Sequence, residues 1–372
     1  MAPALPAPKS DFVGIDDGGV HLGTGGQSPM LVRHRDAFEQ FMADKASGEP
    51  GYTAHAKIGQ ETKALMSRLT HLPAANHAFL GNASEGIGRV ISSMAWQAGD
   101  NVVVSAKDYA SGLVSMVRLA QLGVEPRVVP CDGWQIDPQG LIDACDGRTR
   151  LLYLSQVTSL TGQQFDVEVV SRELSRRGVV FLLDVSHALG VVPVDARLAD
   201  FTVSSGYKFL CSPHVGVFAW NRERRPDFEP LTVGWASGSL SGDRCRYVPN
   251  DDASRAEIGN ANYLDLYLLR ESLTYLLGFG IPAIAAHATG LANRLHAGMK
   301  TLGLDVVTPD DPGQRATSVS FALHDAEGAA AAAREAGISL WSGNGRLRAT
   351  THLFSTDSDI ERYVDWLAAR QT

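Results

Sequence analysis

Short apolar runs rich in β-branched residues alternate with longer amphipathic stretches through the first two thirds of the chain. The apolar runs, which predict strands, cover residues 101–106, 125–131, 150–156, 179–185 and 200–205. Between them, the apolar spacing at 112–123 and 168–178 predicts two helices, each closed by a glycine. Strands that alternate with helices predict an α/β fold with a mostly parallel sheet covered by helices on both faces.

The predicted pattern of secondary structure changes after about residue 260. Helical patterns cover 263–280 and 281–303, and short strands and a closing helix from 359 follow. At 372 residues the chain also exceeds the size at which one hydrophobic core keeps growing. We therefore expect an N-terminal arm over residues 1–20, a large domain over 21–262 and a smaller C-terminal α/β domain over 263–372.

Composition and charge exclude several classes of protein. A formal net charge of −8 without clustered basic residues argues against nucleic-acid binding. The longest apolar stretches are too short to cross a bilayer, and the first residues lack the pattern of a signal peptide. We expect a cytoplasmic protein without a membrane partner. The four cysteines show neither metal-ligand spacing nor a disulfide framework, so we expect reduced thiols and no metal site.

An acid and a lysine each follow a predicted strand. Asp184 ends one apolar run in "DVSHALG", and Lys208 follows the next in "SSGYK". A carboxylate at the end of a buried strand is costly unless it meets a positive partner, and a protonated ring nitrogen is one such partner. A nearby lysine could then form a Schiff base with a carbonyl cofactor. For Lys208 alone, a solvated side chain at a strand end is the alternative interpretation.

The stretch "LGNASEGIGRV" at 80–90 passes from a strand-like run through small residues into a helix. Such a junction offers backbone N–H groups and the Ser84 hydroxyl to an anion at the positive end of the helix dipole. The spacing does not match the dinucleotide-binding fingerprint. In a parallel sheet, ligands lie beyond the carboxyl ends of the strands, which is where Ser155, Asp184 and Ser205 fall.

Several motifs follow one another in an order that resembles the class V, fold-type I pyridoxal-phosphate enzymes. They are "GNASEGIG", "DYASGL", "SLTGQQFDV", "DVSHALG", "SSGYK" and "RLRATTHLFSTDSDIE", and the likeness runs from about residue 20 to the C-terminus. The chain is most similar to the branch that holds kynureninase, isopenicillin N epimerase and cysteine desulfurase. The resemblance implies fold-type I architecture, pyridoxal phosphate as the cofactor, and a homodimer with a shared active site.

The resemblance also implies roles for individual residues. Lys208 would hold the cofactor as a Schiff base and later move the substrate's Cα proton. Asp184 would keep the pyridine nitrogen protonated, so that the ring accepts electrons from Cα. His187 resembles the histidine that contacts the cofactor beside this aspartate, although a hydrogen-bonded core histidine is the alternative.

Further residues resemble the family's cofactor-binding positions. Ser84, with the backbone N–H of Ala83, matches the phosphate-binding pair, and Ser205 and Tyr207 would complete the phosphate site. Tyr109 in "DYASGL" stands where relatives place an aromatic ring over the cofactor, with ordinary core packing as the alternative.

Most of the residues expected to contact the substrate lie closer to the C-terminus. Arg348 matches the arginine that binds the substrate α-carboxylate, and Arg346 is its nearest competitor because strand alternation points both to one face. Asn260 stands where many relatives have a threonine that reaches the neighbouring subunit's phosphate, a departure that weakens this assignment. Trp341 and the segment 232–243, the latter from a partner subunit, are expected to line the substrate cavity, with ordinary packing as the alternative.

The residues before the C-terminal arginine bear on the choice of reaction. Cysteine desulfurases of this family carry a nucleophilic cysteine in a loop shortly before the C-terminal arginine, whereas this chain reads "ISLWSGNGRLRAT" there. That departure disfavours persulfide-forming desulfuration. We predict a lyase that performs β-elimination, a C–S lyase on an S-substituted cysteine, in a specialised pathway such as antibiotic biosynthesis. An amino-acid epimerase, a class V aminotransferase and a decarboxylating oxidative deaminase are the alternatives within the family, and a non-catalytic pyridoxal-phosphate-binding protein is the alternative outside enzymes.

Overall fold

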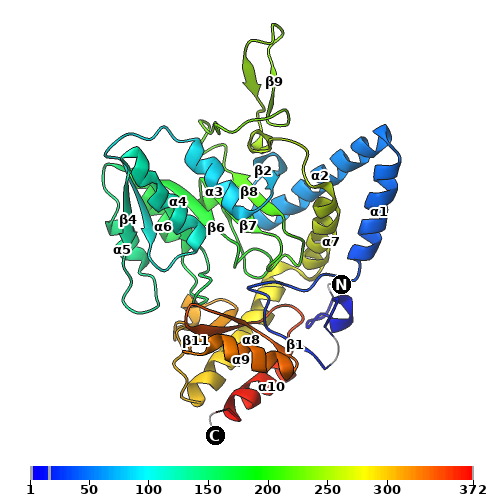
Figure 1. Cartoon of the computed structure of the whole chain (residues 1–372), viewed down its shortest axis with the longest axis vertical. Coiled ribbons are helices and arrows are strands. Elements are labelled where there is room, and N and C mark those ends of the chain that lie inside the picture. The colour runs from blue at the N-terminus through cyan, green and yellow to red at the C-terminus, as the bar shows by residue number, and fades with distance from the viewer. Residues whose placement is uncertain (1–2, 16–17, 371–372) are drawn as a thin grey trace.

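A seven-stranded sheet forms the centre of the molecule (Figure 1). The computed structural model describes residues 3–15 and 18–370. In spatial order the strands are β2 (His77–Leu80), β8 (Gly216–Trp220), β7 (Phe201–Ser205), β6 (Val180–Asp184), β5 (Thr149–Ser155), β3 (Asn101–Ser105) and β4 (Glu125–Val129). β8 runs antiparallel to β2 and β7, and the other neighbouring pairs are parallel. The predicted α/β fold with a mostly parallel sheet is confirmed.

Helices cover both faces of this sheet. Successive residues of β5 show the division, because Leu151 and Tyr153 pack into one hydrophobic cluster whereas Leu152 and Leu154 pack into the other. The first face is covered by α3 (Ala83–Ser92) and α4 (Ala110–Arg118). The second is covered by α1 (His34–Ala46), α2 (Glu49–Thr70), α5 (Pro138–Asp143), α6 (Val167–Arg177) and α7 (Tyr263–Phe279).

The predicted helix over 112–123 differs from the observed element in one respect. α4 ends at Arg118, and a 3₁₀ helix, η3 (Leu119–Leu122), continues the chain to Gly123. Gly123 has a φ of 76°, a left-handed conformation that glycine adopts without steric cost and that commonly ends a helix. Gly123 therefore ends the helical segment as predicted, but the last turn before it is a 3₁₀ turn rather than an α-helical one.

Two glycines bring α3 against the edge of the sheet. A Cβ at Gly86 would lie 2.8 Å from Val203 Cγ1, and one at Gly216 would lie 2.5 Å from the backbone carbonyl carbon of Asn82. A side chain at either position would push the helix away from the strands. Because both glycines lack a Cβ, the first turn of α3 can pack directly against β7 and β8.

The C-terminal part of the chain forms a smaller body below the sheet in Figure 1. It contains a three-stranded antiparallel sheet in the order β11 (Ser318–Ala322), β14 (Arg346–Thr350), β13 (Trp341–Gly343). Its helices are α8 (Ile281–Thr301), α9 (Ala326–Glu335) and α10 (Asp357–Ala368), and β1 (Val20–His21) joins it by pairing in parallel with β12 (Ile338–Ser339). The domain limits at residues 20 and 262 stay a prediction.

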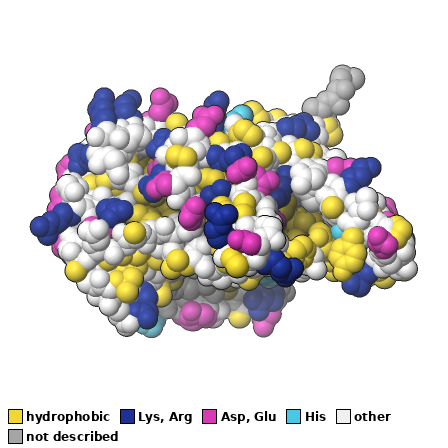
Figure 2. All heavy atoms as spheres, turned by 90° about the horizontal axis from the view of Figure 1, so that it is seen from above, with side chains coloured by type: hydrophobic (Ala, Val, Ile, Leu, Met, Phe, Trp, Pro, Cys, Tyr) yellow, Lys and Arg dark blue, Asp and Glu magenta, His cyan; other side chains and the backbone are white. Residues whose placement is uncertain are grey.

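The remaining elements are short. The 3₁₀ helices are η1 (Lys9–Asp11), η2 (Ala74–Asn76), η4 (Ala196–Leu198), η5 (Ala253–Ala256) and η6 (Pro312–Gln314). β9 (Gly238–Leu240) and β10 (Tyr247–Pro249) form a hairpin that projects from the large body in Figure 1. Acidic and basic side chains are intermixed on the face that Figure 2 shows from the hairpin side.

Single helices within residues 3–15 and 18–370 differ from membrane-spanning helices. No single helix is long and apolar enough to cross a bilayer, although α7 and α8, bent by 79° at their junction, pass on combined length and composition. Many of the apolar side chains of both helices lie in the protein's hydrophobic clusters.

Candidate active site

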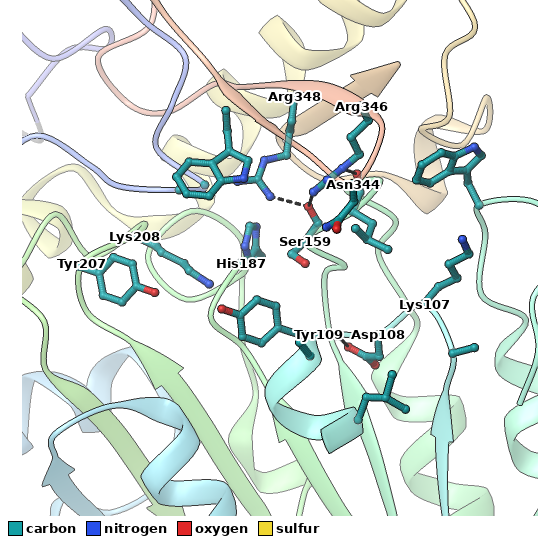
Figure 3. A pocket seen from close by; sticks show the side chains of 18 residues that line it. Lys107, Asp108, Tyr109, Ser159, His187, Tyr207, Lys208, Asn344, Arg346 and Arg348 are labelled. Carbon is teal, nitrogen blue, oxygen red and sulfur yellow. Dashed lines mark hydrogen bonds between the residues drawn. The ribbon is translucent and has the colours of Figure 1, made fainter. Parts of the chain in front are cut away.

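Four strands of the central sheet end in polar residues at one edge. Ser105, Ser155, Asp184 and Ser205 are the last residues of β3, β5, β6 and β7, and Ser155 pairs directly with Asp184. A cavity of about 460 Å³ lies between the loops beyond this edge and β14 of the smaller body. Its lining includes Tyr109, His187, Tyr207, Lys208, Arg346 and Arg348 (Figure 3).

Asp184 is a buried carboxylate held by two hydrogen bonds. The Tyr153 hydroxyl donates to Oδ2 at 2.9 Å, and the backbone N–H of Ser186 donates to Oδ1 at 2.8 Å. Among residues 3–15 and 18–370, no lysine, arginine or histidine forms an ion pair with it. Because a buried unpaired charge is costly, Asp184 is suited to a cationic group of a bound ligand.

Lys208 follows β7 and is only 5% exposed. Its Nζ lies 5.0 Å from the centre of the Tyr109 ring. Burial lowers the pKa of Lys208 to about 8, with Asp184 acting in the opposite direction and Arg348 in the same direction. A larger fraction of this amine is therefore neutral at physiological pH than for a solvated lysine, and the neutral amine is the form that attacks a carbonyl carbon.

His187 is buried next to Lys208 in the lining of the cavity. Burial lowers its pKa well below the usual range, and the positive charges of Lys208 and Arg348 act in the same direction. Its Nδ1 atom has no hydrogen-bond partner among the residues that the structure describes. A neutral imidazole with an unused ring nitrogen differs from the hydrogen-bonded core histidine that was the alternative interpretation, and it is suited to contact a ligand.

Two helix N-termini meet beside the cavity. Ser84 lies in the first turn of α3, and its Oγ is 2.7 Å from Oγ of Ser111 in the first turn of α4. Ala83, the first residue of α3, is buried, while Ser84 is exposed. Helix N-termini attract anions through free N–H groups and the helix dipole. Sequence reasoning missed Ser111, although it lies in the quoted motif "DYASGL" at the start of a helix.

The loop after β7 places Ser205 and Tyr207. Ser205 is buried, and Tyr207 is half-buried with its ring stacked on His214 at 4.3 Å between centres. Burial raises the pKa of Tyr207, against a hydrogen bond with Ser205. Ser28 fixes this loop by donating its backbone N–H and its hydroxyl to the Tyr207 carbonyl oxygen, at 3.0 and 3.1 Å.

Arg346 and Arg348 point into the cavity from the same face of β14, as strand alternation predicts. Arg346 donates from Nη2 to the Ser159 carbonyl oxygen at 2.8 Å, and Nη1 of Arg348 donates to the same oxygen. Burial lowers the pKa of Arg348 to about 9 and that of Arg346 to about 10, so both stay charged at neutral pH. Nε of Arg348 has no partner among the described residues.

Three expected substrate or cofactor contacts differ in position. Trp341 lines the cavity, with Cζ of Arg348 5.8 Å from its ring centre. Asn260 is exposed in a separate cavity beside Gly81. The segment 232–243 includes β9 and does not line the cavity of its own chain. Within one chain, the structure therefore brings Trp341 to the site but neither of the other two.

Asp108 is a buried acid of the site that sequence reasoning missed. It lines the cavity, and its carboxylate accepts hydrogen bonds from the Ser155 hydroxyl at 2.5 Å and the Ser155 backbone N–H at 3.0 Å. Burial raises its pKa to about 6 despite these bonds. The contact ties the loop after β3 to the end of β5. Its position directly before Tyr109, after a strand, was the available signal.

Comparison with known sequences gives a consistent result. Residues 31–356 match the family described as "Aminotransferase class-V". A "Probable cysteine desulfurase" of Methanothermobacter thermautotrophicus is 26% identical over 358 residues, which cover 90% of this chain and 89% of that protein. The isopenicillin N epimerase of Streptomyces clavuligerus is 26% identical over 385 residues, covering 95% and 96% of the two chains.

Solved structures show the same fold. The apo cysteine desulfurase of Thermococcus onnurineus NA1 superposes with a TM-score of 0.89 at 19% identity, covering 100% of this chain and 99% of that chain. The cystine C–S lyase C-DES, in complex with its product cysteine persulfide, superposes with a TM-score of 0.87 at 18% identity and covers 95% and 98%. A mutant of C-DES carries glycine covalently linked to its PLP cofactor.

Proposed function

This chain belongs to the aminotransferase class-V family, and from that premise we propose that it is a C–S lyase acting on an S-substituted cysteine. Pyridoxal phosphate is the cofactor, and the described residues fit it. Asp184 is a buried carboxylate without an ion-pair partner among them, and His187 has an unused ring nitrogen. The hydroxyls of Ser84 and Ser111, which are hydrogen-bonded to each other, lie at two helix N-termini and are suited to bind the phosphate group.

When bound, pyridoxal phosphate supplies an electron-withdrawing ring that stabilises negative charge at the substrate's Cα. Asp184 would lie beside the ring nitrogen of the bound cofactor and favour its cationic form. Lys208 would hold the cofactor and would be the base that accepts the Cα proton, and its lowered pKa of about 8 leaves it competent near neutral pH. Arg348 would hold the α-carboxylate, for which its Nε–H has no other partner among the described residues.

The observation that carries the choice of elimination is the position of the thiols. Within the described part of the chain, none of the four cysteines lines the cavity, and only Asn344 and Gly345 connect β13 to β14. A mechanism that forms a persulfide on the protein needs a protein thiol there to accept sulfur. Without it, the Cβ–S bond breaks with its electron pair on the sulfur, which leaves as a thiol after protonation. With one water molecule, the remaining carbon skeleton yields pyruvate and ammonium.

Epimerisation is a second candidate, supported by the similarity to isopenicillin N epimerase. It requires a second acid–base group on the opposite face of Cα from Lys208. Tyr109 and His187 both lie close enough to interact with Lys208. The Tyr109 ring centre is 5.0 Å from Nζ of Lys208, and the positive charge of Lys208 contributes to the lowered pKa of His187. The similarity also supports a specialised biosynthetic pathway as the setting of the reaction.

A substrate panel tests the two candidates against each other. The holoenzyme is incubated with S-alkyl cysteines in deuterium oxide, and thiol, pyruvate and the configuration of recovered amino acid are measured. We expect equal amounts of thiol and pyruvate, and neither product from the Lys208→Ala variant. Racemised, Cα-deuterated amino acid without thiol would establish epimerisation and contradict elimination.

We also propose that two copies of the chain form the working enzyme. The family resemblance supports this, as do Asn260 and the segment 232–243, which lie away from the cavity of their own chain. Large apolar side chains near the hairpin are exposed, with Leu231 at 82% and Trp235 at 71%. Exposed apolar surface of this kind commonly marks a protein interface.

A further inference from the structure

We propose that the site selects an amino acid whose side chain ends in a carboxylate, and that Arg346 binds this second carboxylate while Arg348 binds the α-carboxylate. This inference rests on the proposed amino-acid substrate and on the proposed role of Arg348. It does not depend on elimination being the reaction that follows.

The first supporting observation is an excess of positive charge. Arg346, Arg348, Lys107 and Lys208 all line the cavity, and Asp108 is the one acidic residue in the described lining. The Asp108 carboxylate is already occupied by hydrogen bonds from Ser155 and from the backbone N–H of Tyr109. Neither arginine forms an ion pair with a carboxylate of residues 3–15 or 18–370. One α-carboxylate therefore leaves a guanidinium without a counter-ion.

The second observation is how Arg346 is held. It donates to three backbone carbonyl oxygens, from Nε to Leu160 at 2.5 Å, from Nη1 to Gly343 at 2.6 Å and from Nη2 to Ser159 at 2.8 Å. A guanidinium has five N–H donors, so two remain. The carbonyls fix the plane of the group but carry no net charge to neutralise it. With Arg346 only 2% exposed, an anionic ligand group would meet a preoriented and poorly solvated cation.

The third observation is the spacing of the two arginines. They stand two residues apart on β14, which places their Cα atoms roughly 6 to 7 Å apart along the strand. In Figure 3, Arg348 lies on the Lys208 side of Ser159, while Arg346 and Asn344 lie on the side towards Lys107. An amino acid whose α-carboxylate meets Arg348 can extend its side chain past Ser159 to Arg346. Because both guanidinium groups donate to the Ser159 carbonyl oxygen, they lie on either side of that oxygen, and a side chain of about the length found in glutamate or slightly longer would connect them.

Binding of matched acids and amides to the holoenzyme tests this inference without requiring a leaving group. L-glutamate is compared with L-glutamine, and L-2-aminoadipate with its side-chain amide, by titration of the cofactor absorbance. We expect each acid to bind about 30-fold more tightly than its amide, because the amide leaves the buried charge of Arg346 unpaired. Equal binding within each pair, or no response to either acid, would overturn the inference.

Two variants assign the effect to Arg346. In Arg346→Gln the affinity for each acid relative to its amide is expected to fall from about 30-fold to about 3-fold or less. Arg346→Lys keeps the charge but loses the fixed plane of the guanidinium, and its affinity ratio is expected to lie between those of the wild type and Arg346→Gln. Thermal unfolding and the cofactor spectrum show whether each variant is folded and loaded. An unchanged ratio in a folded Arg346→Gln would place acid recognition elsewhere and refute the assignment.

A parallel measurement separates this inference from the proposed reaction. S-carboxymethyl-cysteine and S-carbamoylmethyl-cysteine differ only in the terminal acid and amide, and both can release a thiol. If neither releases thiol while glutamate still binds more tightly than glutamine, the elimination proposal fails and acid recognition stands. If both release thiol with equal kcat/KM and the binding ratios are also near one, elimination stands and acid recognition fails.

Discussion

Lys208 and Asp184 occupy the same buried edge of the sheet, and each has an energetic cost without a ligand. Burial disfavours the charged amine, which is why the pKa of Lys208 falls to about 8. Asp184 is stabilised by Tyr153 and Ser186 but lacks an ion-pair partner among the described residues. A cofactor with an electrophilic carbon and a cationic ring nitrogen relieves both costs.

The lowered pKa of Lys208 predicts how cofactor attachment depends on pH. Because attachment requires the neutral amine, its rate in the apo protein should rise with pH and reach half its maximum near pH 8. Stopped-flow absorbance after mixing with pyridoxal phosphate measures this rate. A midpoint above pH 10, that of a solvated lysine, would contradict the assignment.

Lys208→Ala should lose covalent attachment while its circular dichroism and thermal unfolding remain those of a folded protein.

Arg348 should act on the substrate far more than on the cofactor. Replacing it with alanine removes the proposed partner of the α-carboxylate, and we expect amino-acid binding to weaken by about 30-fold or more. Cofactor binding, measured by equilibrium dialysis of pyridoxal phosphate, should change by less than about 3-fold. Equal losses of both affinities would instead assign Arg348 a structural role in the cavity wall.

Tyr153 is a positioning residue because it acts through Asp184. Tyr153→Phe removes a hydrogen bond to a buried carboxylate, a type of bond worth about 1.5 to 3 kcal/mol. The absorbance spectrum of the holoenzyme should then shift, because Asp184 is held less firmly beside the ring nitrogen of the cofactor. Tyr363→Phe is the matched control, because the buried Tyr363 hydroxyl has no partner among the described residues. A shift of similar size in the control would remove the specific role of Tyr153.

At the scale of elements, the site depends on how closely helices approach the sheet edge. α3 and α4 begin beside the carboxyl ends of the parallel strands, and their first turns join through Ser84 and Ser111. The contact between α3 and β8 tolerates no Cβ at Gly216, since the opposing atoms belong to the backbone of Asn82. The position of the proposed phosphate site is therefore set by packing between backbone segments.

Gly216→Ala should displace the first turn of α3. Overpacking against backbone atoms commonly costs about 1 to 3 kcal/mol, so we expect lower thermal stability together with weaker pyridoxal-phosphate binding. Gly88→Ala is the control on the same helix, because a Cβ there meets nothing within 4 Å. It should stabilise the helix by up to about 1 kcal/mol and leave cofactor affinity unchanged. Normal cofactor affinity in Gly216→Ala would show that the phosphate site does not need this close approach.

At the scale of the whole molecule, two bodies enclose the cavity. The large body contributes Lys208, His187 and Tyr109, and the smaller body contributes Arg346 and Arg348. The carbonyl oxygen of Ser159 accepts hydrogen bonds from both arginines and so links the two bodies at the site. The residues proposed to hold the cofactor and the arginines proposed to bind the substrate's carboxylates therefore come from opposite sides.

The dimer proposal predicts a solution mass of twice the chain's 39.8 kDa by light scattering. Trp235→Asp should weaken association, because it places a charge on the exposed apolar surface near the hairpin. Val114→Asp is the control, since Val114 is also exposed, at 66%, but lies on α4. A monomeric wild-type protein with full activity would contradict the proposal.

Local patterns were sufficient to predict β3 to β7 of the central sheet, but they gave no prediction for α1, α2 or β8. The strands ending at Ser155, Asp184 and Ser205 and the helix ending at Arg177 fall within two residues of their predicted limits. Periodicity predicts such elements because side-chain direction repeats along a strand or a helix regardless of what packs against it. The convergence of Asp184 and Lys208 was also predictable, since parallel strands end at one edge of a sheet.

The tertiary structure alone determined the contacts between residues far apart in sequence. Ser84 meets Ser111 across 27 residues, and Arg346 reaches Leu160 across 186. The unused Nδ1 of His187 and the absence of an acidic partner for Arg346 in the described chain likewise depend on every neighbour at once. The elements and the chemistry available at their ends follow from the sequence, because these depend on local periodicity. Only folding decided which charges remain unpaired, because that depends on the complete set of neighbours in three dimensions.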